Sequence, residues 1–262
     1  NKKTYFLYFY FILKQMLNLK QFSIDIRNFE KGKMIGKGGF SEVYLAKYKR
    51  SGEECTAKVL KSRYFKEEEK NNVENEINIL ASIDHPTIIK YLGYSLLDFN
   101  LLPNIVIFTE FAKNGSLNEI ILQAKNSKPP KDYDNTSRQI ILIGISCGMR
   151  YLHSKNIMHR DLKTNNILLD ENFYPRITDY GMAKYVQKNK FCEPTPLCGT
   201  LPYMAPEIIL GKKYSYKIDV YSFGILMYEV ICESDLYPHI MDKDLITKKF
   251  REYVAISNNR PE

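Results

Sequence analysis

The sequence predicts an α+β chain of two lobes, a small lobe rich in strands followed by a larger lobe that is mainly helical. Short apolar segments dominate residues 29–111, whereas helical periodicity dominates after Gly115. The 262 residues are 44% hydrophobic and 26% charged, an ordinary globular balance that suffices for one large or two small cores. Ligand sites tend to form at the junction between two such parts.

The expected boundaries give an N-terminal apolar extension over residues 1–23, the small lobe over 24–112 and the large lobe over 113–262. In the small lobe, Val73, Ile77 and Leu80 recur at three- and four-residue steps after a charged start. This spacing predicts a helix over residues 65–83. Strands are expected around a glycine cluster in residues 29–48, and over residues 54–60, 88–94 and 105–111.

Two long segments of the large lobe, residues 135–153 and 217–232, predict helices. Both are apolar on more than one face, which is typical of a buried helix. Between them we expect short strands at residues 167–169 and 176–177, and then a long irregular stretch. The first helix carries two adjacent apolar stripes: Ile140, Ile143, Gly144, Cys147 and Tyr151, and Ile141, Ile145, Met149 and Leu152.

Charge and cysteine content limit the kinds of partner. The net charge of +8 suits a protein that handles phosphates, although a solvated basic surface is the commoner explanation. No block of Lys and Arg indicates nucleic acid as a partner. The five cysteines are scattered and do not combine with the four histidines at metal-ligand spacing. Reduced thiols and a cytoplasmic location are therefore expected.

The N-terminal region contains an apolar and aromatic run from Tyr5 to Leu13, behind Lys2 and Lys3. A transmembrane helix needs about 20 such residues, and no small-residue cleavage site of a signal peptide follows the run. Because the first residue is Asn rather than Met, we expect a fragment. The run is either the end of a longer membrane segment or a strand or helix that packs on the domain; we expect the second. Membrane anchoring remains the alternative.

A glycine-rich segment, residues 36–43, lies between two expected strands. Glycines let the backbone approach a phosphate closely and present N–H groups to it, although glycine clusters most often mark turns. The segment is not a Walker A loop, because Gly38 stands where that motif needs Ser or Thr. It resembles the glycine-rich loop of protein kinases, G-x-G-x-x-G-x-V, with Ser41 in place of the third glycine.

Lys58 lies in an otherwise apolar strand, and taken alone it indicates an edge-strand lysine that faces water. Glu76 on the following helix favours another interpretation. A kinase needs a lysine held by a helix carboxylate, so that the ammonium group meets the ATP phosphates. Glu76 falls ten residues before Pro86, the spacing familiar from kinases. It is therefore preferred over the neighbouring Glu67, Glu68, Glu69 and Glu74.

Residues 159–166 read His-Arg-Asp-Leu-Lys-Thr-Asn-Asn and match the five fixed positions of the kinase catalytic loop, His-Arg-Asp-Leu-x-x-x-Asn. Chance gives such a match with odds of roughly 10⁻⁴ in a chain of this length. Phosphoryl transfer to a hydroxyl needs a carboxylate that accepts or orients the proton, and Asp161 is the candidate. Lys163 can neutralise the transferring phosphate, and Asn166 can return its side-chain oxygen to Mg²⁺.

Asp179, in Thr-Asp-Tyr-Gly, is the expected principal ligand of Mg²⁺, with Mn²⁺ as an alternative ion. Kinases usually have Phe where this chain has Tyr180. The added hydroxyl needs a partner when it is buried, and it can shift the balance between active and inactive positions of the segment. Ala-Pro-Glu at 205–207 closes this activation segment. Asp219 opens the second long helix, where a carboxylate is either a simple cap or, as in kinases, a hydrogen-bond acceptor for the catalytic-loop backbone.

From about Ile24 to Cys232 the chain thus resembles a eukaryotic-type protein kinase domain. The resemblance implies the bilobal kinase fold, ATP and a protein substrate. It implies Thr109 as the gatekeeper behind the adenine, and Glu110 to Ala112 as the hinge whose backbone pairs with it. Val43, Ala57 and Leu168 would enclose the purine, and Ile35, Gly36, Gly38, Gly39 and Ser41 complete the nucleotide contacts. Leu80, Tyr91, His159 and Tyr180 would form the hydrophobic column of the fold.

Lys163 and Thr200 resemble Ser/Thr kinases, whereas Thr109 and residues 114–117 and 219–224 resemble the tyrosine-kinase-like group. We therefore expect a Ser/Thr kinase of that group, with a dual-specificity kinase as an alternative. The competing class is a pseudokinase that serves as a binding scaffold. A small-molecule kinase is disfavoured by the Ala-Pro-Glu segment. The scaffold is disfavoured because the residues that pseudokinases usually lose are present: Lys58, Glu76, Asp161, Asn166 and Asp179.

Arg160 precedes the catalytic aspartate, and in kinases with this arginine a phosphate on the activation segment often pairs with it. Thr195 is the first candidate for that phosphate and Tyr185 the second. At the other end, residues 260–262 resemble a motif that lies before the last helices of a kinase domain. We therefore expect the chain to stop short of those helices, which would leave Glu207 without its arginine partner and expose apolar surface.

Overall fold

The structure is a computed structural model that describes residues 20–39, 41–61, 67–187, 190–195, 198–237 and 246–261. The chain divides into two compact units. The small unit comprises residues 1–84 and 89–111, and the large unit comprises residues 85–88 and 112–262. The apolar run from Tyr5 to Leu13 lies outside the described residues. Within the described ranges, no helix has the length and apolar character needed to cross a bilayer.

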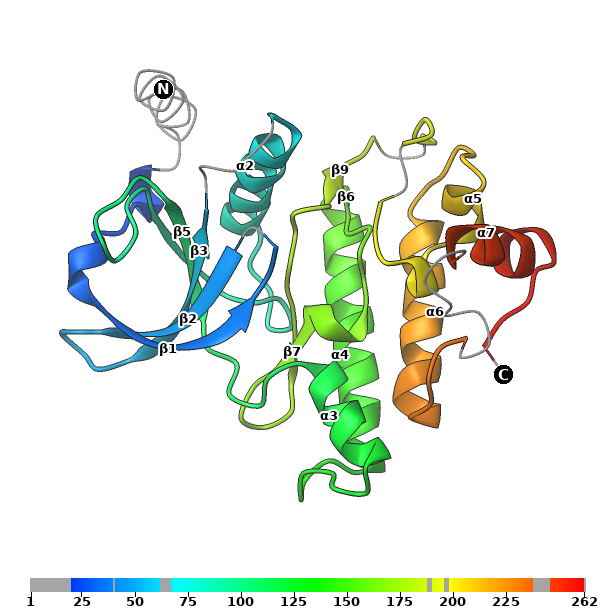
Figure 1. Ribbon diagram of the computed structural model, residues 1–262, viewed down its shortest axis with the longest axis horizontal. Helices are drawn as coiled ribbons and strands as arrows, with labels where there is room; N and C mark the ends of the chain where they lie inside the picture. The colour runs from blue at the N-terminus through cyan, green and yellow to red at the C-terminus, as the bar shows by residue number, and fades with distance from the viewer. Residues whose placement is uncertain are drawn as a thin grey trace. The chain divides into compact units, whose positions relative to one another are not determined.

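The small unit contains an antiparallel sheet in the strand order β1-β2-β3-β5-β4, with one helix beside it (Figure 1). The central strands β3 and β5 provide its core, where Ala57 and Phe108 face each other and are fully buried. The elements are β1 (Phe29–Lys37), β2 (Ser41–Tyr48), β3 (Glu54–Leu60), α2 (Glu67–Ser82), β4 (Tyr91–Ser95) and β5 (Ile105–Glu110). The strands around the glycine cluster and the predicted helix are thereby confirmed.

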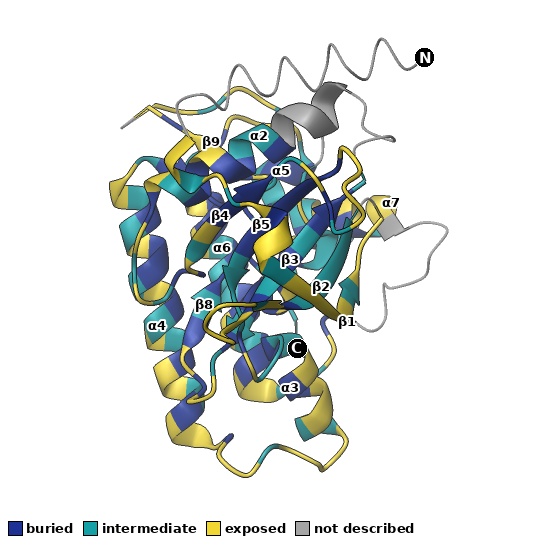
Figure 2. Cartoon of the chain, turned by 90° about the vertical axis from the view of Figure 1, so that its left-hand side faces the viewer, coloured by how far each residue is buried: buried dark blue, intermediate teal, exposed yellow. Residues whose placement is uncertain are grey.

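Strand β1 forms one edge of this sheet and is almost entirely exposed (Figure 2). Its pairing with β2 is interrupted by register shifts between Lys31 and Met34 and between Met34 and Gly36. The side chains of Lys31, Lys33 and Lys37 are exposed along it. The edge is therefore both irregular and charged.

The strand predicted over residues 88–94 was expected to begin too early, because β4 begins at Tyr91. Ile88 instead belongs to the large unit, where it forms an isolated bridge with Ile177. The backbone N–H of Ile177 donates to the carbonyl of Thr87 at 2.8 Å. A turn that returns the Ile88 N–H to the carbonyl of His85 at 3.0 Å separates this contact from β4.

The large unit contains the long helices and two short strand pairs (Figure 1). Two of its helix starts have capping boxes: Ser116 and Glu119 form one at α3, and Asp134 and Ser137 form one at α4. The elements are α3 (Leu117–Lys125), α4 (Asn135–Ser154), β6 (Ile157–Met158), β7 (Ile167–Leu169), β8 (Pro175–Ile177), β9 (Lys184–Tyr185), α5 (Pro206–Ile209), α6 (Lys217–Cys232) and α7 (Ile246–Phe250). Strand β6 pairs with β9, and β7 pairs with β8.

The prediction that α4 is buried on two stripes holds for one of them and only in part for the other (Figure 2). The stripe of Ile141, Ile145, Met149 and Leu152 is buried, whereas Ile143 is 63% exposed and Ile140 is 36% exposed. Gly144 of the other stripe also packs closely, since an added Cβ there would lie 2.5 Å from the Pro175 side chain, but the face of Ile141 and Ile145 is the more buried. Gly148 lies on that face, where an added Cβ would come within 2.6 Å of the Ile177 side chain.

Helix α6 also departs from the prediction of burial on all sides. Its N-terminal Asp219 is only 1% exposed, and Leu226 and Val230 are fully buried. Val220, Met227 and Ile231 are exposed, at 62%, 40% and 57%. Val220 and Met227 lie seven residues apart and Met227 and Ile231 lie four apart, so the three side chains form one apolar stripe along the helix. Apolar surface is therefore exposed along this face of α6.

Candidate active site

The small unit holds an ion pair between strand β3 and helix α2. Lys58 Nζ lies 2.7 Å from Glu76 Oε1, and the two side chains are 27% and 8% exposed. Strand β3 lies between β2 and β5, so Lys58 is not on an edge. The interpretation as a solvent-facing edge lysine is therefore wrong. A carboxylate this buried needs a charged or hydrogen-bonded partner, and the ammonium group supplies one.

The glycine-rich segment connects β1 to β2 in a tight turn. The N–H of Gly38 donates to the carbonyl of Ser41 at 2.8 Å. A Cβ on Gly38 would approach Ser41 Oγ to 2.9 Å, whereas Gly39 has open space around it. Gly36 faces Val43 across the two strands, and Ile35 is 41% exposed. Within the described part of the turn, the Gly38 N–H is thus used in a hydrogen bond, and Gly39 is the glycine with open space around it.

The expected gatekeeper and hinge lie at the end of β5. Thr109 faces Thr56 on one side and Tyr91 on the other, and it is half-buried. Glu110 follows it, and its backbone N–H donates to the carbonyl of Lys90 at 3.0 Å. Ala112 begins the large unit and is 5% exposed. Leu168 belongs to β7 of the large unit, so its place opposite Val43 and Ala57 stays a prediction.

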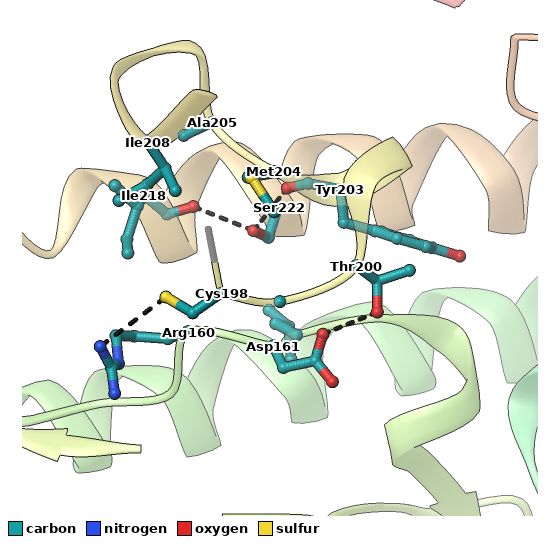
Figure 3. Close-up of a pocket in the computed structure, with 12 residues that line it drawn as sticks. Arg160, Asp161, Cys198, Thr200, Tyr203, Met204, Ala205, Ile208, Ile218 and Ser222 are labelled. Carbon is teal, nitrogen blue, oxygen red and sulfur yellow. Dashed lines mark hydrogen bonds between the residues drawn. The ribbon is translucent and has the colours of Figure 1, made fainter. Parts of the chain in front are cut away.

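Lys163 and Asn166 of the catalytic loop contact one carboxylate, that of Asp161, and Figure 3 shows its contact with Thr200. Thr200 Oγ1 donates to Asp161 Oδ1 at 2.8 Å. Lys163 Nζ lies 2.7 Å from Asp161 Oδ2 and 2.8 Å from Thr200 Oγ1. The amide nitrogen of Asn166 donates to Asp161 Oδ2 at 3.0 Å and to its carbonyl at 2.8 Å. A carboxylate, an ammonium group and a hydroxyl are therefore in mutual contact.

Asp219 at the start of α6 holds the backbone of this loop. Its Oδ1 accepts from the N–H of Arg160, and its Oδ2 from the N–H of His159, both at 2.9 Å. Oδ2 also lies 2.8 Å from Nε2 of His153. The function of Asp219 as an acceptor for the catalytic loop is thereby confirmed, and that of a simple helix cap is excluded. Arg160 has φ +66°, a left-handed conformation that needs such support.

Asp179 is positioned next to Asn166 by the pairing of β7 and β8. The N–H of Thr178 donates to the carbonyl of Asn166 at 3.0 Å. Asp179 itself adopts φ +65°. Because both hydrogen bonds of the Asn166 side chain use its nitrogen, its amide oxygen remains the atom suited to a cation. Within the described ranges, no group of three or more His, Cys, Asp or Glu side chains could hold a metal without other ligands.

Tyr180 is fully buried, and its hydroxyl donates to the carbonyl of Ile177 at 3.1 Å. Burial raises the pKa of Tyr180 well above its ordinary value, so the hydroxyl stays protonated and can donate. The ring lies 5.3 Å from that of His159, centroid to centroid. Nδ1 of His159 accepts from the N–H of Asp161 at 3.3 Å, so Nε2 carries the proton and donates to the Thr178 carbonyl at 3.1 Å. His159 and Tyr180 are thus one part of the expected column.

The activation segment meets Arg160 through a cysteine (Figure 3). Arg160 Nη1 lies 3.7 Å from Cys198 Sγ, and Thr195 Oγ1 lies 3.8 Å from the same sulfur. Arg160 Nε also donates to the carbonyl of Met182 at 2.6 Å. Tyr185, the second candidate for phosphorylation, is 49% exposed on β9. All five cysteines are free thiols.

The carboxylate of Glu207 makes no hydrogen bond or ion pair with any described residue. Arg260 does not reach it as an ion pair. Its guanidinium instead lies 5.1 Å from the ring centroid of Tyr221, a cation–π arrangement.

The structure also contains a hydrogen-bond network at the site that the sequence did not predict. Thr164 Oγ1 lies 3.1 Å from the hydroxyl of Tyr203 and 3.0 Å from Glu229 Oε2, and Tyr203 also donates to Glu229. Burial, followed by the nearby Glu229 charge, raises the pKa of Tyr203, which therefore remains a donor. The only local signal was a carboxylate, Glu229, within the apolar helix α6. The network anchors the catalytic loop to α6 at a second point.

Comparison with known proteins agrees with this geometry. A family model described as the protein kinase domain matches residues 29–261. The probable serine/threonine-protein kinase drkB of Dictyostelium discoideum is 34% identical over 82% of this chain, which spans 29% of that protein. An Aurora kinase of Yarrowia lipolytica is 32% identical, covering 84% of this chain and 56% of its own length. A cysteine-rich receptor-like protein kinase 46 of Arabidopsis thaliana is 33% identical over 78% of this chain, which spans 32% of that protein.

The chain spans between 16% and 56% of the length of the curated relatives that it matches. These relatives are mostly serine/threonine-protein kinases and receptor-like kinases, which agrees with the resemblance to the tyrosine-kinase-like group.

Proposed function

The chain belongs to the protein kinase family, and on that premise we propose that it is an ATP-dependent protein serine/threonine kinase. The family implies ATP, a divalent cation and a protein substrate. The observation that carries the proposal is the contact of Asp161 with both the Thr200 hydroxyl and the Lys163 ammonium group. A hydroxyl already lies within hydrogen-bond distance of the carboxylate that would accept a proton.

In the proposed reaction, Asp161 orients the substrate hydroxyl and accepts its proton as that oxygen bonds to the γ-phosphorus. The bond between the γ-phosphorus and the β–γ bridging oxygen breaks, and ADP leaves. Lys163, held between Asp161 and Thr200, would balance negative charge on the transferring group. In the small unit, Lys58 would bind the ATP phosphates while Glu76 keeps its ammonium group in place. The backbone of the turn at Gly39, next to the Gly38 N–H that is bonded to Ser41, would cover the phosphates.

Asp179 and Asn166 fit a divalent cation, for which we propose Mg²⁺, with Mn²⁺ as the alternative. One carboxylate and one amide oxygen are too few for a cation site made only by protein. They suit Mg²⁺, which is usually bound by one or two carboxylates together with phosphate oxygens and water. When bound, such a cation would offset the negative charge of the phosphates.

The preference for Ser or Thr over Tyr rests on Lys163 and Thr200. Both residues contact Asp161, so that an ammonium group and a threonine hydroxyl lie beside its carboxylate. The resemblance associates these two residues with Ser/Thr kinases. Assays with generic Ser, Thr and Tyr peptides test this directly. Transfer to Tyr at a comparable rate would instead favour the dual-specificity alternative.

The test of the enzyme proposal is phosphoryl transfer from Mg·ATP to a generic protein substrate. We expect Asp161→Asn to lower kcat by about 10²–10⁴ because the proton acceptor is lost. The exposed Asp132→Asn serves as the matched control and should leave kcat unchanged. Nucleotide binding without transfer in the full-length protein would favour the pseudokinase scaffold.

We further propose Thr195 as the activating phosphorylation site. Thr195 Oγ1 and Arg160 Nη1 both lie within 3.8 Å of the Cys198 sulfur, so a phosphate on Thr195 would be within reach of the guanidinium group. Mass spectrometry of active protein should find the phosphate at Thr195 rather than at Tyr185. Fully active protein with no phosphate between Asp179 and Glu207 would contradict this.

For the location, we propose the cytoplasm, which supplies ATP and keeps thiols reduced. Membrane anchoring through the N-terminal region is the alternative. Fractionation of cells that express the full-length protein distinguishes the two.

A further inference from the structure

Residues 20–28, named here the N-terminal strap, lie just outside the range that the kinase family model matches. The strap nevertheless belongs to the small unit and packs on its sheet. The N–H of Ile24 donates to the carbonyl of Tyr94 at 2.7 Å, and Ser23 forms a parallel bridge with the same residue. The strap therefore covers the outer side of β4, which is an edge strand of the sheet.

The backbone of β4 is shaped to receive the strap. Gly93 has φ +147°, and a Cβ at this position would lie 2.4 Å from the carbonyl oxygen of Phe22 and 2.7 Å from Cδ1 of Ile24. Both distances are far shorter than real Cβ contacts. Because the first clash is with backbone, only a glycine lets the strap approach this closely.

The strap continues into the core of the sheet and is fixed at its far end. Ile26 is 4% exposed and belongs to the same buried cluster as Ala57 and Phe108. Asp25 accepts from the N–H of Arg27 at 3.0 Å and so caps the short turn at Ile26. The carbonyl of Asn28 accepts from the N–H of Lys49 at 2.9 Å.

Two residues of the N-terminal strap connect it, through their packing, to residues that are expected to contact the nucleotide. The Phe22 ring lies 5.4 Å from that of Tyr91, and Tyr91 faces Thr109 across the β4–β5 pairing. Ile26 packs in the cluster that contains Ala57. Thr109 and Ala57 are the residues that the resemblance assigns to the back of the adenine site and to the purine.

We propose that the N-terminal strap is a positioning element of the nucleotide site. It holds β4 against β5, so that Tyr91, Thr109 and Ala57 keep the geometry in which the adenine is bound. This proposal rests on the proposed function, because it concerns the ATP site of the same enzyme. A strap that served only global stability would change the melting temperature and leave the KM for ATP untouched.

The main test variant is Gly93→Ala in the full-length protein, with Phe22→Ala as a second variant that removes the ring contact without strain at Gly93. We expect the KM for ATP to rise about tenfold, corresponding to about 1.4 kcal/mol of lost binding, with kcat changed much less. Phe22→Leu, which keeps an apolar side chain against Tyr91, should recover most of the affinity.

Gly52→Ala is the matched control. Gly52 also has a positive φ, +77°, but it lies in the β2–β3 turn, and the nearest atom to its added Cβ is Lys47 Cε at 3.6 Å. The control therefore introduces similar backbone strain without touching the strap. It should leave the KM for ATP unchanged.

Hydrogen exchange without nucleotide gives a readout independent of catalysis. The amides of β4 and β5 should exchange faster in Gly93→Ala than in Gly52→Ala. If the wild-type protein binds ATP and both strap variants keep its KM, the positioning proposal is overturned while the proposed function stands. If the amides of β4 and β5 exchange at the wild-type rate in both strap variants, the positioning proposal is overturned as well. If the wild-type protein neither binds ATP nor transfers phosphate, the proposed function fails, and the positioning proposal fails with it.

Discussion

Asp219 Oδ1 accepts the backbone N–H of Arg160 at 2.9 Å, so a buried carboxylate on helix α6 restrains the residue that precedes the catalytic aspartate. Asp219→Ala would leave the N–H groups of His159 and Arg160 without this acceptor in a buried place. We expect a loss of about 3 kcal/mol in the free energy of unfolding, because buried unpaired donors are costly. Chemical denaturation measures this loss.

Asp235→Ala provides the comparison for that prediction. Asp235 pairs with Lys125 at 2.7 Å but is 80% exposed, so its removal should cost well under about 1 kcal/mol. Equal losses in the two variants would show that Asp219 does not support the loop as its hydrogen bonds indicate.

Thr200 is expected to contribute to catalysis through its hydroxyl rather than its shape. Thr200→Val keeps the volume but removes the group that contacts both Asp161 and Lys163. We expect kcat to fall by about tenfold to a hundredfold, since the carboxylate and the ammonium group lose a shared partner. Thr200→Ser keeps the hydroxyl and should retain most of the activity. Steady-state kinetics at saturating ATP tests both variants.

The hydroxyl of Tyr180 should stabilise the position of the segment that carries Asp179. Tyr180→Phe removes its hydrogen bond to the Ile177 carbonyl, and we expect the free energy of unfolding to fall by about 1 kcal/mol. Tyr174→Phe is the control, because Tyr174 is 49% exposed. Thermal unfolding of the two variants should separate them, and a Tyr180→Phe protein as stable as the control would contradict the expectation.

Cys55 should make stability depend on pH in the alkaline range. Burial raises the pKa of its thiol from the ordinary 9.0 to about 11. As the pH rises above about 9, the unfolded chain releases this proton while the folded protein retains it. The contribution is therefore complete below pH 9 and is lost between pH 9 and 11, about 3 kcal/mol in all.

Comparison with Cys55→Ala separates the contribution of Cys55 from those of the tyrosines and lysines that titrate in the same pH range. The variant should be less stable by a constant amount near neutral pH, because a buried side chain is shortened. The difference between wild type and variant should then shrink as the pH rises from 9 to 11. A difference that stays constant over this range would contradict the raised pKa.

Much of this site could be predicted from the sequence because its chemistry depends on residue types at fixed spacing. Lys58, Asp161 and Asp219 were identified in this way. The pairing of Lys58 with Glu76 needed the family resemblance, since periodicity places both residues on their elements but does not join a strand to a helix. The contact of Thr200 with Asp161 joins residues 39 positions apart and depends on tertiary folding.

Burial was the part that the sequence predicted least well. Both stripes of α4 contain isoleucines, and nothing in residue type distinguishes the covered Ile141 from the exposed Ile143. Which face is covered depends on where β8 and the residues around Thr87 lie, as the close approach of Ile177 to Gly148 illustrates. The network of Thr164, Tyr203 and Glu229 also depends on tertiary folding, because its members come from three separate segments.

The irregular edge strand β1 has a consequence for the behaviour of the protein at high concentration. An open sheet edge can recruit a strand from another molecule, which is a common start of aggregation. On the β4 side, Ser23 and Ile24 already occupy the edge. On the β1 side, two register shifts and the exposed Lys31, Lys33 and Lys37 oppose the addition of a further strand. The small unit is thereby protected from polymerising through its sheet at both ends.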